Sequence, residues 1–319
     1  MAVNLDKPHR WKEDIAKSVD MFNKWFLEFA PKTFRDSRVQ TTKQVVATLK
    51  ATKNLTEIEP SVLLANPGVL PTLRMSTCPP LAVDRLIGLS GVAGSLIKKM
   101  EIEKKIPTRM SEDEINKELM KIGKIIKQMA DPDIFVWLKR SQPATETEIL
   151  RAATIVADRL CGSVANPIIR NAQEKRQLAL IKAWLEARNY QQLPAGRGVK
   201  FDSLPNGSFS FRTNVPVRLG GGKQINIPID AVIMPKTAKI GDLPLLLEAK
   251  SAGDFTNVNK RRKEEAAKMT QLRNAYGNKI RFNLFLCGYF DSGYLGYEAS
   301  EGIDWVWEHR IDELAKFGL

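Results

Sequence analysis

The chain has 319 residues, 43% of them hydrophobic, and a formal net charge of +13. This length and apolar content suffice for a substantial core in one large domain or two, and the positive charge favours a polyanionic partner. Three widely separated cysteines form no C-x-x-C pair and only two histidines occur, one near each end, which argues against a zinc finger and against a hydrolytic centre built on histidines.

The first half of the chain is expected to be helical. Apolar residues recur there at helical spacing, and Ser111 followed by Glu114 forms a capping-box pattern before one of the apolar runs. The predicted helices cover residues 14–29, 81–100, 111–130 and 145–160. We therefore predict a mainly helical N-terminal region, residues 1–163, that helps the protein to dimerise or to grip its partner.

No segment has the pattern of a targeting or membrane sequence. The beginning of the chain has charged residues next to Trp11, where a secretory signal needs an uninterrupted apolar core, and no apolar run approaches transmembrane length. The cysteines suit a reducing compartment, where they act as small apolar residues. We expect a soluble, cytoplasmic protein with no membrane partner.

Residues 164–319 show a different order of patterns. A helical stripe that includes Trp184 is followed by three strand-like segments, a second helix and an apolar strand, with a glycine turn at 220–222 after the first strand. In chain order these elements cover residues 171–189, 208–219, 224–234, 243–250, 257–276 and 280–290. The sequence thus predicts an α/β fold of the α+β kind, with a mixed sheet flanked by helices.

Two neighbouring predicted strands carry carboxylates. In the strand 224–234, alternate residues from Ile225 to Ile233 form one apolar face, so Asp230 points to the other side. In the next strand Glu248 and Lys250 lie on one side, roughly 6.6 Å apart. If the strands pair, the two carboxylates can hold a hard divalent cation, while Lys250 orients or deprotonates water or neutralises a phosphate. These groups suit metal-dependent hydrolysis of a phosphodiester.

A glutamate followed two residues later by a lysine is, by itself, a common surface pattern. In this chain, however, the leucines at 245–247 form a continuous apolar run that is typical of a strand buried on both faces. Glu248 and Lys250 interrupt this run, and buried charges need a partner or a metal. We therefore interpret both residues as functional.

The helix 257–276 begins close behind Lys250 with a run of cations and amides. A helix N-terminus suits phosphate, and arginine and asparagine can read base edges in duplex DNA. In helical register Glu265 faces the sheet, where it can support a metal site, although a charge run is alternatively a solvated helical face. The candidate DNA contacts are Thr256, Asn257, Asn259, Lys260, Arg261, Arg262 and Lys263.

On these residues the chain resembles the PD-(D/E)XK nuclease superfamily. The core of that superfamily runs helix, three strands, helix, strand, and its metal-binding residues lie at the positions of Asp230, Glu248 and Lys250. One departure is Ile229, which separates Pro228 from Asp230 where the family pattern has an adjacent pair. The segment 248–266, together with 11–35 and 166–178, is similar to type II restriction endonucleases of the XamI-type family.

The resemblance implies sequence-specific, Mg²⁺-dependent cleavage of double-stranded DNA. A short palindromic site would match a homodimer, and a cognate DNA methyltransferase would be a functional rather than a physical partner. Because the first core helix of this superfamily often contributes an acidic residue, the resemblance also implies a catalytic role for Glu174. The alternative is that Glu174 is a helix-start carboxylate favoured by the helix dipole.

Two other functions remain open on the sequence. A DNA repair or recombination nuclease would share the same core and read DNA structure rather than sequence, and a defined fragment ladder from plasmid DNA would exclude it. A non-catalytic DNA-binding protein would bind duplex DNA without cutting it. The intact set of Asp230, Glu248 and Lys250 argues against this last reading.

Overall fold

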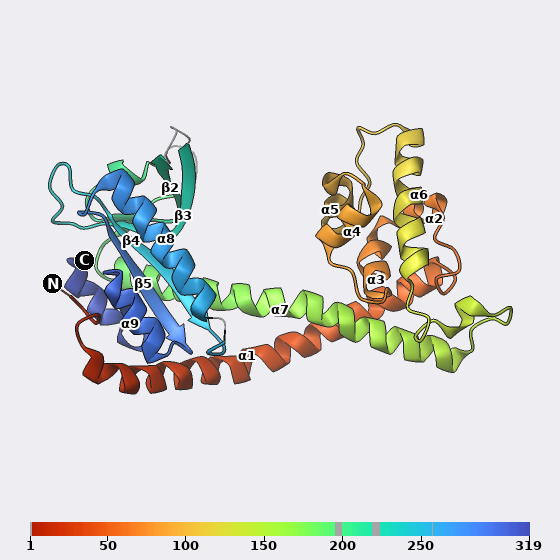
Figure 1. The fold of residues 1–319 in the computed structure, drawn as a ribbon, viewed down its shortest axis with the longest axis horizontal. Helices are drawn as coiled ribbons and strands as arrows, with labels where there is room; N and C mark the ends of the chain where they lie inside the picture. The colour runs from red at the N-terminus through yellow and green to blue at the C-terminus, as the bar shows by residue number, and fades with distance from the viewer. Residues whose placement is uncertain (1, 195–199, 219–223, 257) are drawn as a thin grey trace. The chain divides into compact units, whose positions relative to one another are not determined.

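The chain forms two compact units. The structure, a computed structural model, describes residues 2–194, 200–218, 224–256 and 258–319, with side chains of 258–261 left out. The sheet unit comprises Met1–Phe29 and Arg170–Leu319, and the helical unit comprises Ala30–Ile169. Two long helices, α1 (Pro8–Ala51) and α7 (Glu146–Glu186), contribute residues to both units (Figure 1).

The helical unit contains five further α-helices among its described residues, packed around an apolar core. The longest, α6, begins with the predicted capping box, because the Ser111 hydroxyl accepts from the Glu114 N–H and the Glu114 carboxylate accepts from the Ser111 N–H. The five are α2 (Pro60–Ala65), α3 (Leu70–Met75), α4 (Val83–Ser90), α5 (Gly94–Ile102) and α6 (Glu112–Met129), with 3₁₀ turns at Pro67–Val69 and Val136–Lys139.

Two of the predicted helices differ from the structure. The single helix predicted at 81–100 is two helices, because Gly91 adopts a left-handed conformation with φ of 63° that ends α4. The helices predicted at 145–160 and 171–189 are instead parts of α7, which continues through Pro167. The apolar stripe of α7 serves the helical core up to Leu160 and the sheet core from Leu178, so its pattern looks like two helices.

The sheet unit contains a six-stranded mixed sheet whose spatial order, β1-β2-β3-β4-β5-β6, is also the chain order. The β2–β3 and β3–β4 pairs are antiparallel. The β1–β2, β4–β5 and β5–β6 pairs are parallel. Parallel neighbours need crossover connections, which α8 and α9 supply. The strands are β1 (Gln191–Gln192), β2 (Ser208–Arg218), β3 (Gln224–Met234), β4 (Leu245–Ala252), β5 (Arg281–Gly288) and β6 (Asp304–Trp307).

Helices cover both faces of the sheet. On one face, α8 (Val258–Tyr276) and α9 (Ser292–Ser300) pack their apolar residues against the strands. On the other face, the C-terminal part of α7 and the 3₁₀ segment Glu308–Phe317 pack against the strands. The succession α7, β2, β3, β4, α8, β5 follows the predicted order, with the short β1 added before β2.

The apolar face predicted for β3 is wrong in one respect. Ile227 and Ile229 belong to the core under α8, but Ala231 and Ile233 belong to the core under α7, and Val232 is buried rather than solvent-facing. The change occurs at Asp230, opposite Arg212, whose φ of 52° interrupts regular β geometry in β2. Both faces of β3 are therefore buried beyond Asp230.

The beginning of the chain is fastened to the end of the sheet unit. The Asp304 carboxylate accepts hydrogen bonds from the backbone N–H groups of Val3, Asn4 and Leu5 at 2.5, 2.9 and 3.1 Å. The Asn4 side chain also donates to the Trp305 carbonyl, at 2.9 Å. We call residues 3–5 with Asp304 the N-terminal clasp.

Among the described residues no helix is both long and apolar enough to cross a membrane.

Candidate active site

The pairing of β3 with β4 places the two predicted carboxylates side by side. Ala231 pairs with Leu247 in the antiparallel register, and because Asp230 precedes Ala231 while Glu248 follows Leu247, the two carboxylates come next to this pair on adjacent strands. The Asp230 Oδ2 atom also accepts a hydrogen bond from the Ala249 N–H at 2.9 Å. The two strands thus pair, which was the condition for this site, and the pairing holds the Asp230 carboxylate against the β4 backbone.

Glu248 is buried and meets two lysines. Its Oε1 atom accepts from the Lys250 Nζ atom at 3.1 Å and from the Lys268 Nζ atom at 2.5 Å. Its Oε2 atom is buried and has no hydrogen-bond partner among the described residues. A buried oxygen without a donor is costly unless another group binds it. One oxygen of Glu248 thus binds the two lysine side chains, and the other oxygen remains available to a further ligand.

Glu265 extends this cluster from α8. It is fully buried and faces the sheet, as the helical register predicted, whereas its neighbour Glu264 is exposed. The Glu265 Oε1 atom lies 3.6 Å from the Lys250 Nζ atom, and its Oε2 atom accepts from the Tyr294 hydroxyl at 2.7 Å. Lys250 therefore lies between two carboxylates, Glu248 and Glu265.

Burial and mutual repulsion control the charges here. Burial, together with the nearby Glu248 carboxylate, raises the pKa of Asp230 to about 6. Burial alone would lower the pKa of Lys250, but the Glu248 and Glu265 carboxylates outweigh it and raise that pKa above its usual value. Lys250 is therefore a fixed positive charge at neutral pH rather than a ready proton acceptor.

The donor set fits a hard divalent cation. Asp230 and Glu248 offer adjacent carboxylate oxygens, one of them buried without a partner, and the repulsion that raises the pKa of Asp230 would be relieved by a cation. Within the described part of the chain no group of three or more His, Cys, Asp or Glu side chains is placed to hold a metal ion, so the protein would supply two carboxylates at most. Mg²⁺ commonly uses one or two carboxylates and fills its other positions with water and phosphate oxygens.

The first core helix contributes both polar and charged contacts. Glu174 is partly exposed and pairs with Arg212 at 2.8 Å, and its charge raises the pKa of Asp230 slightly. Arg176 instead lies 2.6 Å from the buried Glu308 carboxylate. Gln177 donates to the backbone carbonyl of Lys250 at 3.3 Å and thus ties α7 to β4. Glu174 lies next to the carboxylate cluster rather than within it.

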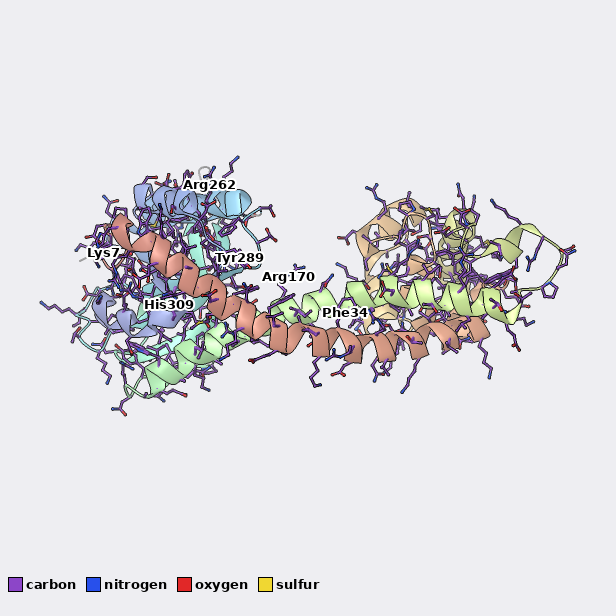
Figure 2. All side chains as sticks on the ribbon, turned by 90° about the horizontal axis from the view of Figure 1, so that it is seen from below. Lys7, Phe34, Arg170, Arg262, Tyr289 and His309 are labelled. Carbon is purple, nitrogen blue, oxygen red and sulfur yellow. The ribbon has the colours of Figure 1, made fainter. Side chains whose placement is uncertain are left out.

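The predicted DNA contacts can be placed only in part. Thr256 is exposed and its N–H donates to Asp254 at 2.9 Å. The Arg262 guanidinium, labelled in Figure 2, lies over the Tyr297 ring, 5.0 Å from its centroid, and Lys263 is exposed. Outside the description fall Asn257, the side chains of Asn259, Lys260 and Arg261, and the glycine turn at 220–222.

Several site residues were not predicted from the sequence. Lys268 lies one turn beyond Glu265 on α8, and this spacing of three could have revealed it. Tyr294 and Glu298 come from α9, whose sequence SGYLGYEAS gives no clear apolar period and was not predicted as a helix. Gln177 carried no signal beyond its place in the helix. These residues surround the carboxylates that the motif did identify.

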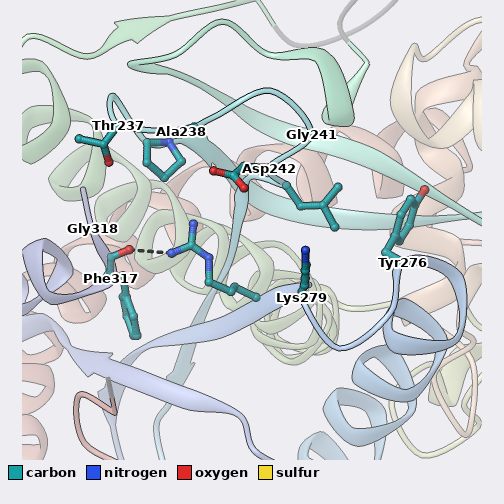
Figure 3. A pocket seen from close by; sticks show the side chains of 11 residues that line it. Thr237, Ala238, Gly241, Asp242, Tyr276, Lys279, Phe317 and Gly318 are labelled. Carbon is teal, nitrogen blue, oxygen red and sulfur yellow. Dashed lines mark hydrogen bonds between the residues drawn. The ribbon is translucent and has the colours of Figure 1, made fainter.

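A cavity of about 600 Å³ lies elsewhere on the sheet unit, lined by residues that include Asp242, Lys279 and Arg281 (Figure 3). Arg281 pairs with Leu245 at the start of β4 and donates to the Phe317 carbonyl at 2.8 Å. Five residues of strand, roughly 16 Å, separate Leu245 from Lys250. This cavity is therefore separate from the carboxylate cluster.

Comparison with known proteins gives the family. A profile described as XamI restriction endonuclease matches residues 53–307, most of the chain. The chain belongs to the XamI restriction endonuclease family. The resemblance inferred from the sequence is thus confirmed, and with it the assignment as a restriction endonuclease, a DNA-cleaving enzyme.

A relative supports the same family over the whole chain. The type II restriction enzyme SalI of Streptomyces albus G is 52% identical over 316 residues, which cover 99% of each chain. Among solved structures, protein VC1899 from Vibrio cholerae aligns with 90% of this chain and 56% of its own, at 11% identity and a TM-score of 0.29. That likeness is too low to carry an argument about this fold.

Proposed function

We propose that this protein is a Mg²⁺-dependent type II restriction endonuclease with a catalytic core of the PD-(D/E)XK kind. Membership of the XamI family supports sequence-specific cleavage of double-stranded DNA. The observation that carries the assignment of the active site is the convergence of Asp230, Glu248 and Lys250 at the β3–β4 pair. In this proposal Asp230 and Glu248 hold the cation.

Each group has a distinct task in this arrangement. The bound cation would supply a Lewis acid at the scissile phosphate. Asp230 and Glu248 bind that cation, and the Ala249 N–H fixes the orientation of the Asp230 carboxylate. Lys250, kept positively charged by Glu248 and Glu265, neutralises phosphate charge and orients the attacking water. Glu265 supports this set through Lys250, and Glu174 adds negative charge at its edge.

Cleavage of plasmid DNA tests the proposal directly. The purified protein should give discrete fragments with Mg²⁺ and none with a chelator, and sequencing of their ends should reveal one common sequence. Random nicking would favour a structure-directed or nonspecific nuclease. Duplex binding without any cutting would contradict the enzymatic assignment.

The DNA-binding role belongs, in our proposal, to the loop and helix start after β4. These residues are Thr256, Asn257, Asn259, Lys260, Arg261, Arg262 and Lys263. Arg261→Ala or Arg262→Ala should weaken binding or relax base choice, whereas Glu248→Ala should abolish cleavage and leave DNA affinity largely intact. Equal loss of binding in all three variants, measured by gel shift without Mg²⁺, would refute this division of roles.

We also propose a homodimer that places one active site on each strand of a palindromic sequence. A mixed dimer of one wild-type subunit and one Glu248→Ala subunit should then nick a single strand of the site. Such a mixture would be prepared with two affinity tags and analysed on supercoiled plasmid. Double-strand cleavage by the mixed dimer at the wild-type rate would contradict the arrangement. The cognate DNA methyltransferase remains a functional partner that need not bind this chain.

A further inference from the structure

A second pair of carboxyl groups lies next to Lys250. Glu265 on α8 and Glu298 on α9 are both fully buried, and their side chains are within hydrogen-bonding reach of each other. Neither oxygen of Glu298 meets a donor among the described residues, and the nearby Tyr294 hydroxyl donates to Glu265. Two ionised carboxylates can only accept hydrogen bonds, so this pair is satisfied when one of them carries a proton.

The surroundings decide which carboxyl group carries the proton. Glu265 has cationic and hydroxyl partners, Lys250 at 3.6 Å and Tyr294 at 2.7 Å, which favour its ionised form. Glu298 instead faces the Glu265 carboxylate and lies near a further acid, Glu301, and both negative charges disfavour ionisation of Glu298. The positive charge of Lys250 favours its ionised form, but this is the smallest of the effects. Burial first, and then the Glu265 carboxylate, raise the pKa of Glu298 to about 9. Glu298 is thus the neutral partner at pH 7.

We propose that Glu298 is a positioning residue for DNA cleavage, because its neutral carboxylic acid donates a hydrogen bond to Glu265 and so fixes the carboxylate that holds Lys250. This inference rests on the function proposed above for Lys250. It extends the active site by one layer, from β4 through α8 to α9. Glu298 itself touches neither the proposed cation ligands nor the DNA.

Two variants of Glu298 separate this role from simple packing. Glu298→Gln keeps the size and supplies an amide donor to Glu265, so cleavage should stay close to that of wild type. Glu298→Leu fills the same space without a donor, so kcat should fall about tenfold to a hundredfold, as for residues that orient catalytic groups. DNA affinity without Mg²⁺ and the thermal unfolding midpoint report whether either variant is merely misfolded.

The outcomes distinguish the inference from the proposed function. If wild-type protein does not cut DNA, the proposed function fails. If wild type cuts and Glu298→Leu, folded and DNA-binding, cuts equally well, the positioning role is overturned. If Glu298→Gln is as inactive as Glu298→Leu, activity requires an ionised Glu298, and the proposed role of Glu298 as a neutral hydrogen-bond donor is overturned.

A spectroscopic measurement tests the proton without DNA or metal. Infrared spectra of the free enzyme at pH 8 should contain the carbonyl stretching band of a protonated carboxylic acid, because ordinary surface carboxyl groups are ionised at that pH. The band should disappear in Glu298→Gln and persist in Glu264→Gln, the matched control on the exposed side of α8. A band absent from wild type, or retained in Glu298→Gln, would show that Glu298 does not carry this proton.

Discussion

The buried ion pairs of the helical unit and the carboxylate cluster of the sheet unit differ in how completely their charges are paired. In the helical unit the buried Arg74 forms two hydrogen bonds with the Glu101 carboxylate, at 2.7 and 2.8 Å, and Arg159 pairs with Asp131 at 3.0 Å. In the carboxylate cluster of the sheet unit, by contrast, Glu248, Glu265 and Glu298 each have at least one oxygen without a hydrogen-bond partner among the described residues. Buried charges such as Arg74 are paired in the helical unit, and Asp304 is paired in the sheet unit, whereas the carboxylate cluster keeps open oxygens.

This difference indicates where a functional arrangement of charges lowers the stability of the fold. A buried, paired charge specifies one arrangement of its neighbours, and removing one partner is destabilising. A buried, unpaired oxygen stabilises nothing by itself, and it persists where another group, such as a cation or a proton, completes it. The helical unit is therefore expected to lose stability when its charges are neutralised, whereas the sheet unit is expected to lose activity.

The largest expected effect is on cleavage. Asp230→Asn should reduce activity by roughly 10⁴-fold or more, as loss of a catalytic residue does. Its stability should rise by up to about 3 kcal/mol at pH 7. The reason is that the folded-state pKa of Asp230 is raised to about 6, so its ionised form at pH 7 is disfavoured in the fold. Plasmid cleavage and urea unfolding measure both quantities.

Asp20→Asn is the matched control for this variant, since Asp20 is an exposed acid on α1 within the sheet unit and its loss should alter neither quantity appreciably. An Asp230→Asn protein that cuts DNA normally, or that is less stable than wild type, would remove the proposed distinction between the two units.

The next effect is on the helical unit. Arg74→Ala should lower its free energy of unfolding by about 3–5 kcal/mol, because Glu101 is left as a buried charge without its partner. The double variant Arg74→Met, Glu101→Leu should recover most of this loss. Urea unfolding of the single and double variants gives the coupling. A double variant as unstable as the sum of the two single variants would show that the pair is not energetically linked.

The effect of pH is smaller when it is expressed per pH unit. The pKa of Glu298 rises from 4.5 to about 9 on folding, so above pH 4.5 the unfolded chain loses a proton that the folded chain keeps. This group therefore makes the protein less stable as pH rises towards 9, by up to about 1.4 kcal/mol per pH unit. Urea unfolding at several pH values should give a flatter profile for Glu298→Gln. Parallel profiles for the two proteins would contradict the assignment.

The smallest effect is at the start of α6. Ser111→Ala should lower the stability of the helical unit by about 1 kcal/mol, because the Glu114 N–H loses its cap. Cleavage should be unchanged, since no part of the carboxylate cluster is altered. Ser111→Asp retains a capping oxygen and should behave like wild type in thermal unfolding. A loss of activity without a loss of stability would show that this helix has a role beyond the architecture of its unit.

Strand patterns and one motif carried most of what the sequence could predict. The bounds of β3 follow from alternation, and Asp230, Glu248 and Lys250 follow from the chemistry of hydrolysis and a buried apolar run. Alternation could not reveal the switch of core at Asp230, because it depends on the unusual backbone of Arg212 in the neighbouring strand. Pairing with a distant residue leaves no mark on local periodicity.

The rest of the site was hidden for a related reason. Tyr294 and Glu298 reach Glu265 from α9, a helix of nine residues with two glycines and a weak apolar pattern. Its position is fixed by Leu295 and Tyr294 in the core rather than by helix propensity. Likewise, α7 continues through Pro167 because the helix packs in one core before the proline and in another core after it. Local helix propensity, which disfavours an internal proline, could not predict this.

The N-terminal clasp has a consequence for the order in which a newly made enzyme is completed. The Val3 N–H can form its hydrogen bond only when Asp304, 301 residues further along the chain, has been synthesised. During translation the helical unit leaves the ribosome whole, whereas the clasp cannot close until the last strand has been synthesised. A product truncated before Asp304 therefore lacks the carboxylate of the clasp, so the sheet unit cannot be completed until synthesis has passed that residue.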